Sequence, residues 1–256
     1  RPGGRSGRTA TVAVESVEHA YRPDQPVLRG VSLEVAAAER VALVGASGAG
    51  KTTLAGLIAG VRRPTGGLIR LGGTSMADLD PDEVRRSVAI LTQEVHVFAG
   101  PLADDLRLAR PGATDDELRD ALARVGAGDW AAALPDELDT VVGDGGHRLT
   151  VTQAQQLALA RLVLVDPPIA VLDEATAEAG SAGARLLEAA VEEALAGRTG
   201  IVVAHRLAQA VSADRVVVLD AGRVLEDGTH AELSVRPDGH YAALWRAWAD
   251  HRPSSD

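Results

Sequence analysis

The sequence predicts an α/β fold whose core is interrupted by a helical insertion. An apolar strand at Arg40–Val44 runs directly into a glycine-rich loop that opens a helix at Lys51. This strand–loop–helix unit is the local context that a phosphate-binding loop requires. Farther along, the chain is mostly helical in pattern from about residue 101 to 165, and apolar strands return at Ile169. The order of elements therefore predicts an α/β core interrupted by helices.

Hydrophobic periodicity and helix-start signals place the individual elements. Alternation with period two predicts strands, and apolar residues at helical spacing predict helices. Asp80 before Pro81, and Thr114 three residues before Glu117, are helix-start signals. The expected strands are 11–17, 31–35, 40–44, 88–92, 169–172, 200–204, 214–219 and 223–226, and the expected helices are 51 to about 59, 80–86, 114–125, 129–133, 150–165, 181–195 and 240–251.

The composition excludes several classes of protein. The chain has 256 residues, of which 46% are hydrophobic, so it has ample apolar residues for one large or two small globular domains. A net charge of −10, without a basic stripe, argues against a nucleic-acid partner. The absence of cysteine rules out disulfides and thiolate metal sites. No apolar run approaches the ~20 residues that cross a bilayer, and residues 1–10 are expected to form a flexible linker.

The glycine-rich loop contains the only lysine among the 26 basic residues of the chain. Lys51 occupies the lysine position of the pattern G-x-x-x-x-G-K-S/T, in the run Gly45-Ala46-Ser47-Gly48-Ala49-Gly50-Lys51-Thr52. An ammonium group is a compact point charge that fits between two phosphates, whereas a guanidinium is a planar fork. The backbone N–H groups cradle the phosphates, and Thr52 offers a hydroxyl to Mg²⁺. The alternative is a glycine-rich turn with a solvated lysine.

A second candidate site element lies at the end of a buried strand. The apolar run from Ile169 ends in the two carboxylates of Asp173 and Glu174. When such a strand end lies beside a phosphate-binding loop, one carboxylate is presented to Mg²⁺ and the other to the attacking water. The alternative is a strand that ends in two solvated acids.

Further motifs occur before and after this pair of carboxylates, in a fixed order along the chain. They are Leu91-Thr92-Gln93-Glu94, Asp173-Glu174-Ala175-Thr176, Val202-Val203-Ala204-His205-Arg206-Leu207, Asp220-Ala221-Gly222-Arg223-Val224 and Asp227-Gly228-Thr229-His230. With the loop of Lys51, they make the chain resemble the nucleotide-binding domain of an ABC transporter over about residues 11–250. The exporter-type subgroup is indicated by Phe98-Ala99-Gly100, and by Ala133-Leu134-Pro135-Asp136 before Gly143-Asp144-Gly145-Gly146.

The resemblance implies a fold and a domain organisation. The expected fold class is a P-loop NTPase (RecA-like) core with an antiparallel β subdomain and an ABC-type helical subdomain at about residues 95–165. Residues 1–10 would be a linker from an upstream transmembrane domain, and residues 251–256 would be a flexible tail.

The resemblance also implies ATP and Mg²⁺ as cofactors and assigns a role to each matching residue. ATP would be bound by Tyr21, Gly45, Ala46, Ser47, Gly48, Ala49, Gly50, Lys51, Thr52 and Thr53. Tyr21 would stack on adenine, its alternative being a surface tyrosine near a turn. Thr52, Gln93 and Asp173 would hold Mg²⁺. The catalytic set would be Lys51, Gln93, Glu174 as general base, and His205 at the γ-phosphate, where the alternative is a structural histidine.

The chain departs from the family in two elements that act across the dimer. In this family, each ATP lies between the phosphate loop of one subunit and a Leu-Ser-Gly-Gly-Gln signature of the other. Here the signature segment reads Leu149-Thr150-Val151-Thr152-Gln153. The loop after Glu174 reads Ala177-Glu178-Ala179-Gly180, where the family has Ser-Ala-Leu-Asp. Branched Cβ atoms in place of glycine should keep backbone and phosphate apart.

The elements that act on the partner's nucleotide are altered, whereas the elements that act on this chain's own nucleotide are intact. This combination predicts a heterodimer. The expected partner is a second ABC nucleotide-binding domain, on a non-identical chain with an intact signature. A transmembrane domain, fused upstream or separate, would hold both at the cytoplasmic face of the membrane. The residues also allow an ATP-binding regulatory or structural module without turnover, or a non-transport ABC ATPase. The latter would require a coiled-coil insertion, tandem domains or basic surfaces, and the sequence contains none of them.

Overall fold

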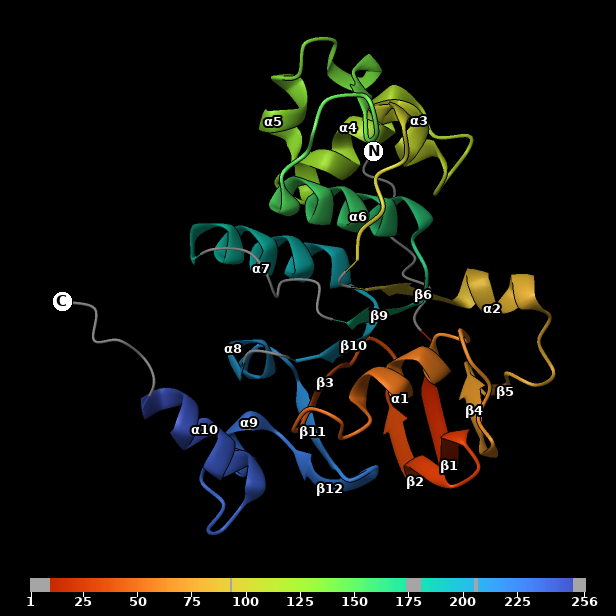
Figure 1. Ribbon diagram of the computed structural model, residues 1–256, viewed down its shortest axis with the longest axis vertical. Helices are drawn as coiled ribbons and strands as arrows, with labels where there is room; N and C mark the ends of the chain where they lie inside the picture. The colour runs from red at the N-terminus through yellow and green to blue at the C-terminus, as the bar shows by residue number, and fades with distance from the viewer. Residues whose placement is uncertain (1–9, 93, 174–180, 205–206, 251–256) are drawn as a thin grey trace. The chain divides into compact units, whose positions relative to one another are not determined.

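The computed structural model describes residues 10–92, 94–173, 181–204 and 207–250, and it confirms the α/β fold class (Figure 1). The chain divides into two compact units, each described by itself. The core unit combines the residues up to Ile90 with Pro168–Asp173 and those from Gly197 onward. The helical unit comprises Leu91–Pro167 together with Glu174–Ala196.

A six-stranded sheet of order β12-β11-β3-β10-β9-β6 forms the centre of the core unit. The pairs of β3 with β10 and β11, and of β10 with β9, are parallel. Their apolar runs are buried on both faces, as is usual for parallel strands covered on both sides. The strands are β3 (Arg40–Val44), β6 (Val88–Leu91), β9 (Ile169–Asp173), β10 (Thr199–Val203), β11 (Arg215–Asp220) and β12 (Arg223–Gly228).

The core unit also contains an antiparallel sheet of order β2-β1-β4-β5, as the resemblance implied. Its strands are β1 (Val12–Arg22), β2 (Gln25–Val35), β4 (Gly66–Leu71) and β5 (Thr74–Ser75). β1 and β2 are longer than the sequence predicted, because β1 continues past Val17 through further register shifts, after Val17 and after His19. The buried residue of this further stretch is the polar His19, so no apolar alternation marks the strand beyond Val17.

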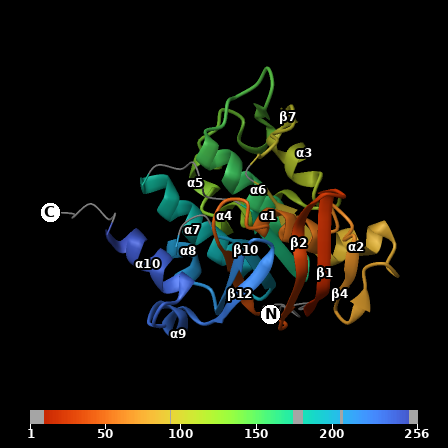
Figure 2. The ribbon, with the colours of Figure 1, turned by 60° about the horizontal axis from the view of Figure 1, so that its bottom comes forward.

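Helix α1 (Lys51–Ile58) contacts β9 and β10 of one sheet and β2 of the other. Its apolar residues, among them Leu54 and Leu57, therefore join a hydrophobic core to which both sheets contribute. The other helices of this unit are α2 (Pro81–Ser87), α8 (Leu207–Val211), α9 (His230–Ser234) and α10 (His240–Asp250). Asp80 caps α2 through a capping box, as expected. Figure 2 shows α9 and α10 beside β12.

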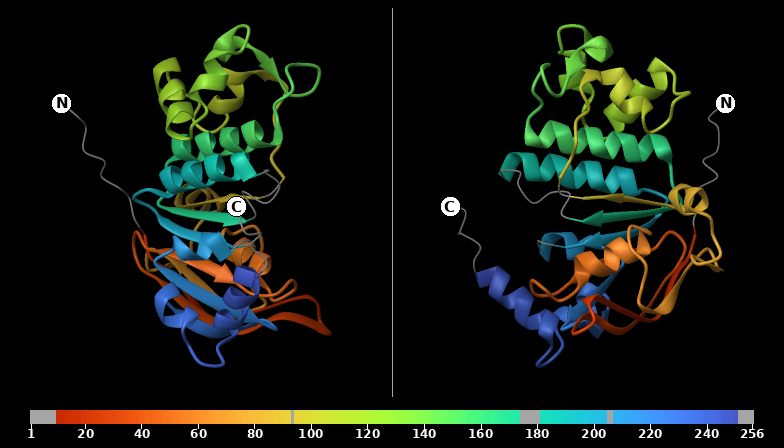
Figure 3. Two further views of the ribbon diagram at one scale, coloured as in Figure 1. Left: turned by 90° about the vertical axis from the view of Figure 1, so that its left-hand side faces the viewer. Right: turned by 45° about the vertical axis from the view of Figure 1, so that its right-hand side comes forward.

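In the helical unit, α6 and α7 lie side by side, and α4 packs on α6 (Figure 3). Gln156 of α6 fixes the α4–α5 connection by donating to the carbonyls of Val125 and Gly126 and accepting from the indole of Trp130. The helices are α3 (Leu102–Arg107), α4 (Asp115–Arg124), α5 (Gly128–Ala132), α6 (Val151–Val165) and α7 (Ser181–Leu195), with a 3-10 turn at Glu137–Asp139. The two-residue strands β7 (Gly100–Pro101) and β8 (Val141–Val142) pair with each other, and they are too short to leave a sequence pattern.

Candidate nucleotide-binding site

The backbone of the glycine-rich loop can be formed only with glycine at its first position. Gly45 follows β3 with φ at +153°, and a Cβ there would lie 2.1 Å from the carbonyl oxygen of Leu219 on the neighbouring strand. At the end of the loop, Gly50 is the N-cap of α1, and no side chain caps this helix. The N–H groups of its first turn are therefore not taken by a capping side chain, which suits the binding of an anion. Ala46, Ser47 and Gly48 lie exposed between these two glycines.

The ammonium group of Lys51 is held inside the loop. The side chain is buried, and Nζ donates hydrogen bonds to the carbonyl oxygens of Gly45 at 2.7 Å and Ala46 at 2.9 Å. The loop thus wraps around the cation of the first residue of α1. A phosphate that entered the loop would meet backbone N–H groups and this positive charge together.

Thr52 and Asp173 bring two oxygen ligands together from distant parts of the chain. The exposed hydroxyl of Thr52 donates to Oδ1 of the buried Asp173 at 3.3 Å. The sheet order explains this meeting, because β9, which ends at Asp173, is separated from β3 only by β10. Oxygen ligands of this kind suit Mg²⁺, which completes its shell with phosphate oxygens and water. The residues present therefore fit a Mg²⁺–nucleotide, whose metal Thr52 and Asp173 would hold.

Tyr21 lies close to the same helix. Its hydroxyl is 3.0 Å from the hydroxyl of Thr53, the third residue of α1. Although 52% of Tyr21 is exposed, the guanidinium of Arg62 lies over the ring, 4.9 Å from its centroid. The sequence predicted the tyrosine and not the arginine, because no local motif marks a contact between β1 and the turn after α1.

Gln93, Glu174 and His205 lie outside the described residues, so their predicted roles stay predictions. The described strands that lead to two of them end at the same edge of the sheet. Val203 pairs with Asp173 on one side and with Leu43 on the other, and all three strands run in parallel. The chain therefore continues toward Glu174, toward His205 and into the loop of Lys51 from one edge of the sheet.

The signature segment belongs to the helical unit, where it forms the start of α6. Thr150 is the N-cap and accepts from the backbone N–H of Gln153 at 3.2 Å, while Oε1 of Gln153 accepts from the N–H of Thr150 at 2.9 Å. The side chains of Thr150 and Gln153 thus both cap the start of the helix. Val151, the first helical residue, is 53% exposed, so an apolar branched side chain covers part of the surface at this end.

No helix in the described part of the chain combines the length and the apolar character that a membrane span requires. This finding concerns residues 10–92, 94–173, 181–204 and 207–250.

The fold, the loop around Lys51 and the Thr52–Asp173 pair define a P-loop nucleotide-binding domain with a helical unit inserted into it. The family model described as ABC transporter matches residues 28–177. The chain belongs to this ABC transporter family. It is an ATP-binding domain of the exporter type, and such domains are ATPases that use ATP with Mg²⁺.

Similar proteins carry this domain within longer chains. A multidrug efflux ATP-binding/permease protein of Mycobacterium bovis is 42% identical over 237 residues, which cover 92% of this chain and 20% of the relative. An ATP-dependent lipid A-core flippase of Chromobacterium violaceum is 39% identical over 234 residues, which cover 91% of this chain and 40% of the relative. The structure of a bacterial Atm1-family ABC exporter with ATP bound gives a TM-score of 0.86 at 34% identity, with 97% of this chain and 43% of that chain covered. The chain thus spans less than half the length of these proteins.

Proposed function

We propose that this domain binds and hydrolyses ATP to drive transport across a membrane, as one half of a heterodimer. The observation that carries the proposal is a contrast within this chain, between its intact phosphate-binding residues and its altered signature segment. The loop of Lys51 and the Thr52–Asp173 pair have the residues and contacts that a Mg²⁺–nucleotide needs. The signature segment has branched side chains where the family has glycines.

Each of the intact nucleotide-binding and catalytic residues has a defined role in phosphoryl transfer. Lys51 and the loop N–H groups neutralise and orient the phosphates, and Tyr21 stacks on adenine. Mg²⁺, when bound, stabilises the charge that develops on the phosphoryl oxygens. Thr52, Asp173 and Gln93 would hold this ion, and Gln93 would also contact the attacking water. Glu174 accepts the proton of that water, and His205 contacts the γ-phosphate.

The altered signature determines which of the two composite sites turns over. A γ-phosphate in contact with a signature is bound by backbone N–H groups at a helix start, and these require close approach. Val151 and Thr152 occupy that helix start with branched Cβ atoms, and Val151 is largely exposed. The site that receives this segment is therefore the degenerate one. The competent site combines the phosphate loop of this chain with the intact signature of a non-identical partner.

The membrane part of the protein follows from the relatives. Two of the similar proteins are named as an efflux ATP-binding/permease protein and a flippase, and each is longer than this chain. We therefore propose a permease part, fused to this domain or carried on a separate chain. It would place the domain at the cytoplasmic face of the membrane, and the permease part would select the cargo.

A second candidate function is ATP binding without turnover, and the exposed Val151 favours it. The presence of Glu174, the expected general base, opposes it. ATP hydrolysis by the purified complete transporter separates the two. We expect Glu174→Gln to reduce turnover at least about 100-fold, the scale of general-base catalysis. Glu188→Gln, which removes a carboxylate from α7, serves as the matched control and should leave turnover unchanged. Turnover at the background level in both the wild type and Glu174→Gln would favour the module without hydrolysis.

A further inference from the structure

We propose that Arg62 is a positioning residue for the base of the bound nucleotide. Its guanidinium covers one face of Tyr21 and holds the ring so that a purine stacks on the opposite face. The inference rests on the proposed function, because it takes Tyr21 as the residue that stacks on the base.

The contact between Arg62 and Tyr21 has the geometry of a cation–π interaction. Cζ of Arg62 lies 4.9 Å from the ring centroid, within the distance of about 6 Å at which such pairs attract. Arg62 follows α1, whereas Tyr21 is near the end of β1, so the tertiary structure alone joins them. Half of Tyr21 stays exposed beside this contact, which leaves surface for a second planar partner.

Two further contacts fix the orientation of the Tyr21 ring. Its hydroxyl lies 3.0 Å from that of Thr53, and the ring of His19 meets it edge-on, with centroids 5.0 Å apart and planes at 90°. His19 is buried, and neither of its ring nitrogens has a hydrogen-bond partner among the described residues. The contact of His19 with Tyr21 is therefore one of aromatic packing. A ring held by its hydroxyl, by an aromatic neighbour and by a cation on one face loses little rotational freedom when a base stacks on it.

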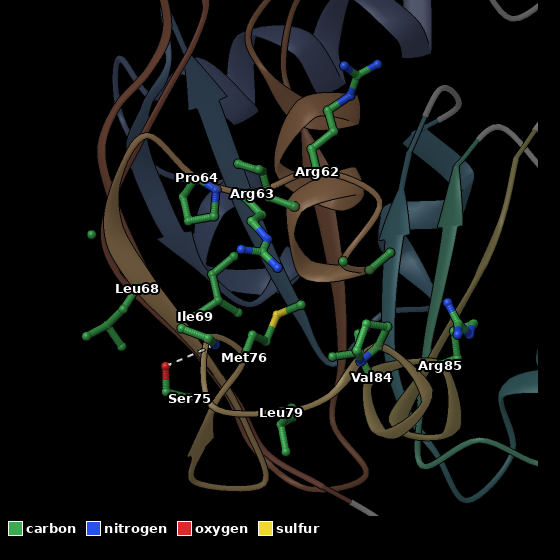
Figure 4. A pocket seen from close by; sticks show the side chains of 16 residues that line it. Arg62, Arg63, Pro64, Leu68, Ile69, Ser75, Met76, Leu79, Val84 and Arg85 are labelled. Carbon is green, nitrogen blue, oxygen red and sulfur yellow. Dashed lines mark hydrogen bonds between the residues drawn. The ribbon is translucent and has the colours of Figure 1, made fainter.

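The neighbouring arginine has a different direction. Both arginines line a cavity of about 340 Å³, but the side chain of Arg63 points toward Ile69 and Met76, whereas that of Arg62 points away from these two residues (Figure 4). Both arginines are exposed and carry the same charge. Arg63→Ala therefore removes an identical charge from the adjacent position without touching Tyr21, and it is the matched control.

The experiment measures binding of ATP and of inorganic tripolyphosphate to the intact protein by calorimetry. Tripolyphosphate occupies the phosphate loop and has no base. We expect Arg62→Ala to raise the Kd of ATP by about two- to fivefold relative to Arg63→Ala, the range of an exposed cation–π contact. Its Kd for tripolyphosphate should equal that of Arg63→Ala. The KM for ATP should rise while kcat stays unchanged, and Arg62→Lys, which keeps a cation, should recover part of the affinity.

A double-mutant cycle tests whether Arg62 acts through the ring. In a Tyr21→Ala background, Arg62→Ala should add no further loss of ATP affinity. The inference is overturned if the two losses add, if both arginine variants weaken ATP binding equally, or if tripolyphosphate binding falls as much as ATP binding. Tighter ATP binding by Arg62→Ala would also overturn it, because the guanidinium would then compete with the base. Lys51→Ala tests the proposed function separately and should abolish binding of both ligands.

Discussion

At the end of β3 the backbone passes close to β11, and Gly45 is the residue that permits this approach. We predict that Gly45→Ala destabilises the protein and weakens ATP binding, because its Cβ would lie 2.1 Å from the carbonyl oxygen of Leu219. Relief of such a clash requires the loop or β11 to shift, at a cost of about 1–3 kcal/mol. Urea unfolding and ATP calorimetry provide the two measurements.

Gly56→Ala is the control for this substitution within the adjoining helix. A Cβ at Gly56 would meet nothing within 4 Å, and the residue lies inside α1. Alanine there should raise the free energy of unfolding by about 0.5–1 kcal/mol, because glycine is the poorer helix former. A loss of stability in Gly56→Ala comparable to that in Gly45→Ala would contradict the steric argument.

At the scale of elements, a buried ion pair joins α3 to α6 in the helical unit. Arg161 donates to both carboxylate oxygens of Asp105 and to the carbonyl oxygen of His96 at 3.0 Å. The backbone N–H of Phe98 donates to the same carboxylate at 2.9 Å. The Asp105 side chain is 1% exposed, so the pair is removed from solvent and also holds the segment that precedes α3.

We predict that Asp105→Ala lowers the free energy of unfolding by about 3–5 kcal/mol, because it leaves the partly buried Arg161 without its carboxylate. Urea unfolding checks this value. Asp104→Ala is the comparison, since this neighbouring carboxylate is 69% exposed and lies 3.9 Å from Arg107. It should cost less than about 0.5 kcal/mol. Similar losses in the two variants would show that burial of the pair is not the cause.

The burial of Tyr241 in α10 should make the free energy of unfolding fall at alkaline pH. Burial raises the pKa of Tyr241 to about 12, from an ordinary value near 10. The neutral phenol is therefore favoured in the folded state. Its contribution to stability is complete below pH 10 and is lost as the pH rises from 10 towards 12, because the unfolded chain ionises first.

We predict that the wild type loses about 2–3 kcal/mol more than Tyr241→Phe over this pH interval. Unfolding free energies of both proteins at several pH values provide the measurement. Tyr241→Phe removes the hydroxyl, which lies 2.8 Å from Nδ1 of His230, and keeps the ring. Parallel pH profiles for the two proteins would rule out Tyr241 as the titrating group.

At the scale of the whole molecule, the start of α6 should decide whether this chain can act without a different partner. We predict that the double substitution Val151→Gly and Thr152→Gly gives a homodimer of the complete chain an ATPase activity at least about tenfold above that of the unsubstituted chain. Restored glycines allow the backbone N–H groups to approach a γ-phosphate, an interaction of the type whose loss costs 100-fold or more. ATP hydrolysis at saturating Mg²⁺ is the measurement.

Two controls accompany the double substitution. Adding Glu174→Gln should remove the acquired activity, which shows that it comes from the site of this chain. Thermal unfolding should change little, because glycine at the first helical positions costs about 1 kcal/mol or less at each. If the unsubstituted homodimer hydrolyses ATP as fast as the complete assembly, the heterodimer proposal is wrong.

Much of the fold followed from patterns that are local in sequence. Arg40–Val44 and Ser181–Leu195 have the predicted bounds, and α4 and α6 differ from theirs by the cap residues alone. β1 was predicted too short because the buried residue beyond Val17 is the polar His19, so the apolar alternation stops there. The two-residue strands β7 and β8 depend on each other for their hydrogen bonds, so neither has a pattern of its own.

The sequence by itself determined the family, the phosphate loop and the residues expected in the site, because these are runs in which spacing and residue type suffice. It also determined that the signature is altered, since Val151 and Thr152 are read directly from the chain. The resemblance already implied that Thr52 and Asp173 share one Mg²⁺, and the tertiary structure added the hydrogen bond by which they meet. Only the tertiary structure decided that Arg62 lies on Tyr21. The first meeting depends on the order of strands in a parallel sheet. The second depends on the packing of α1 between two sheets, and neither arrangement is encoded in any short stretch of residues.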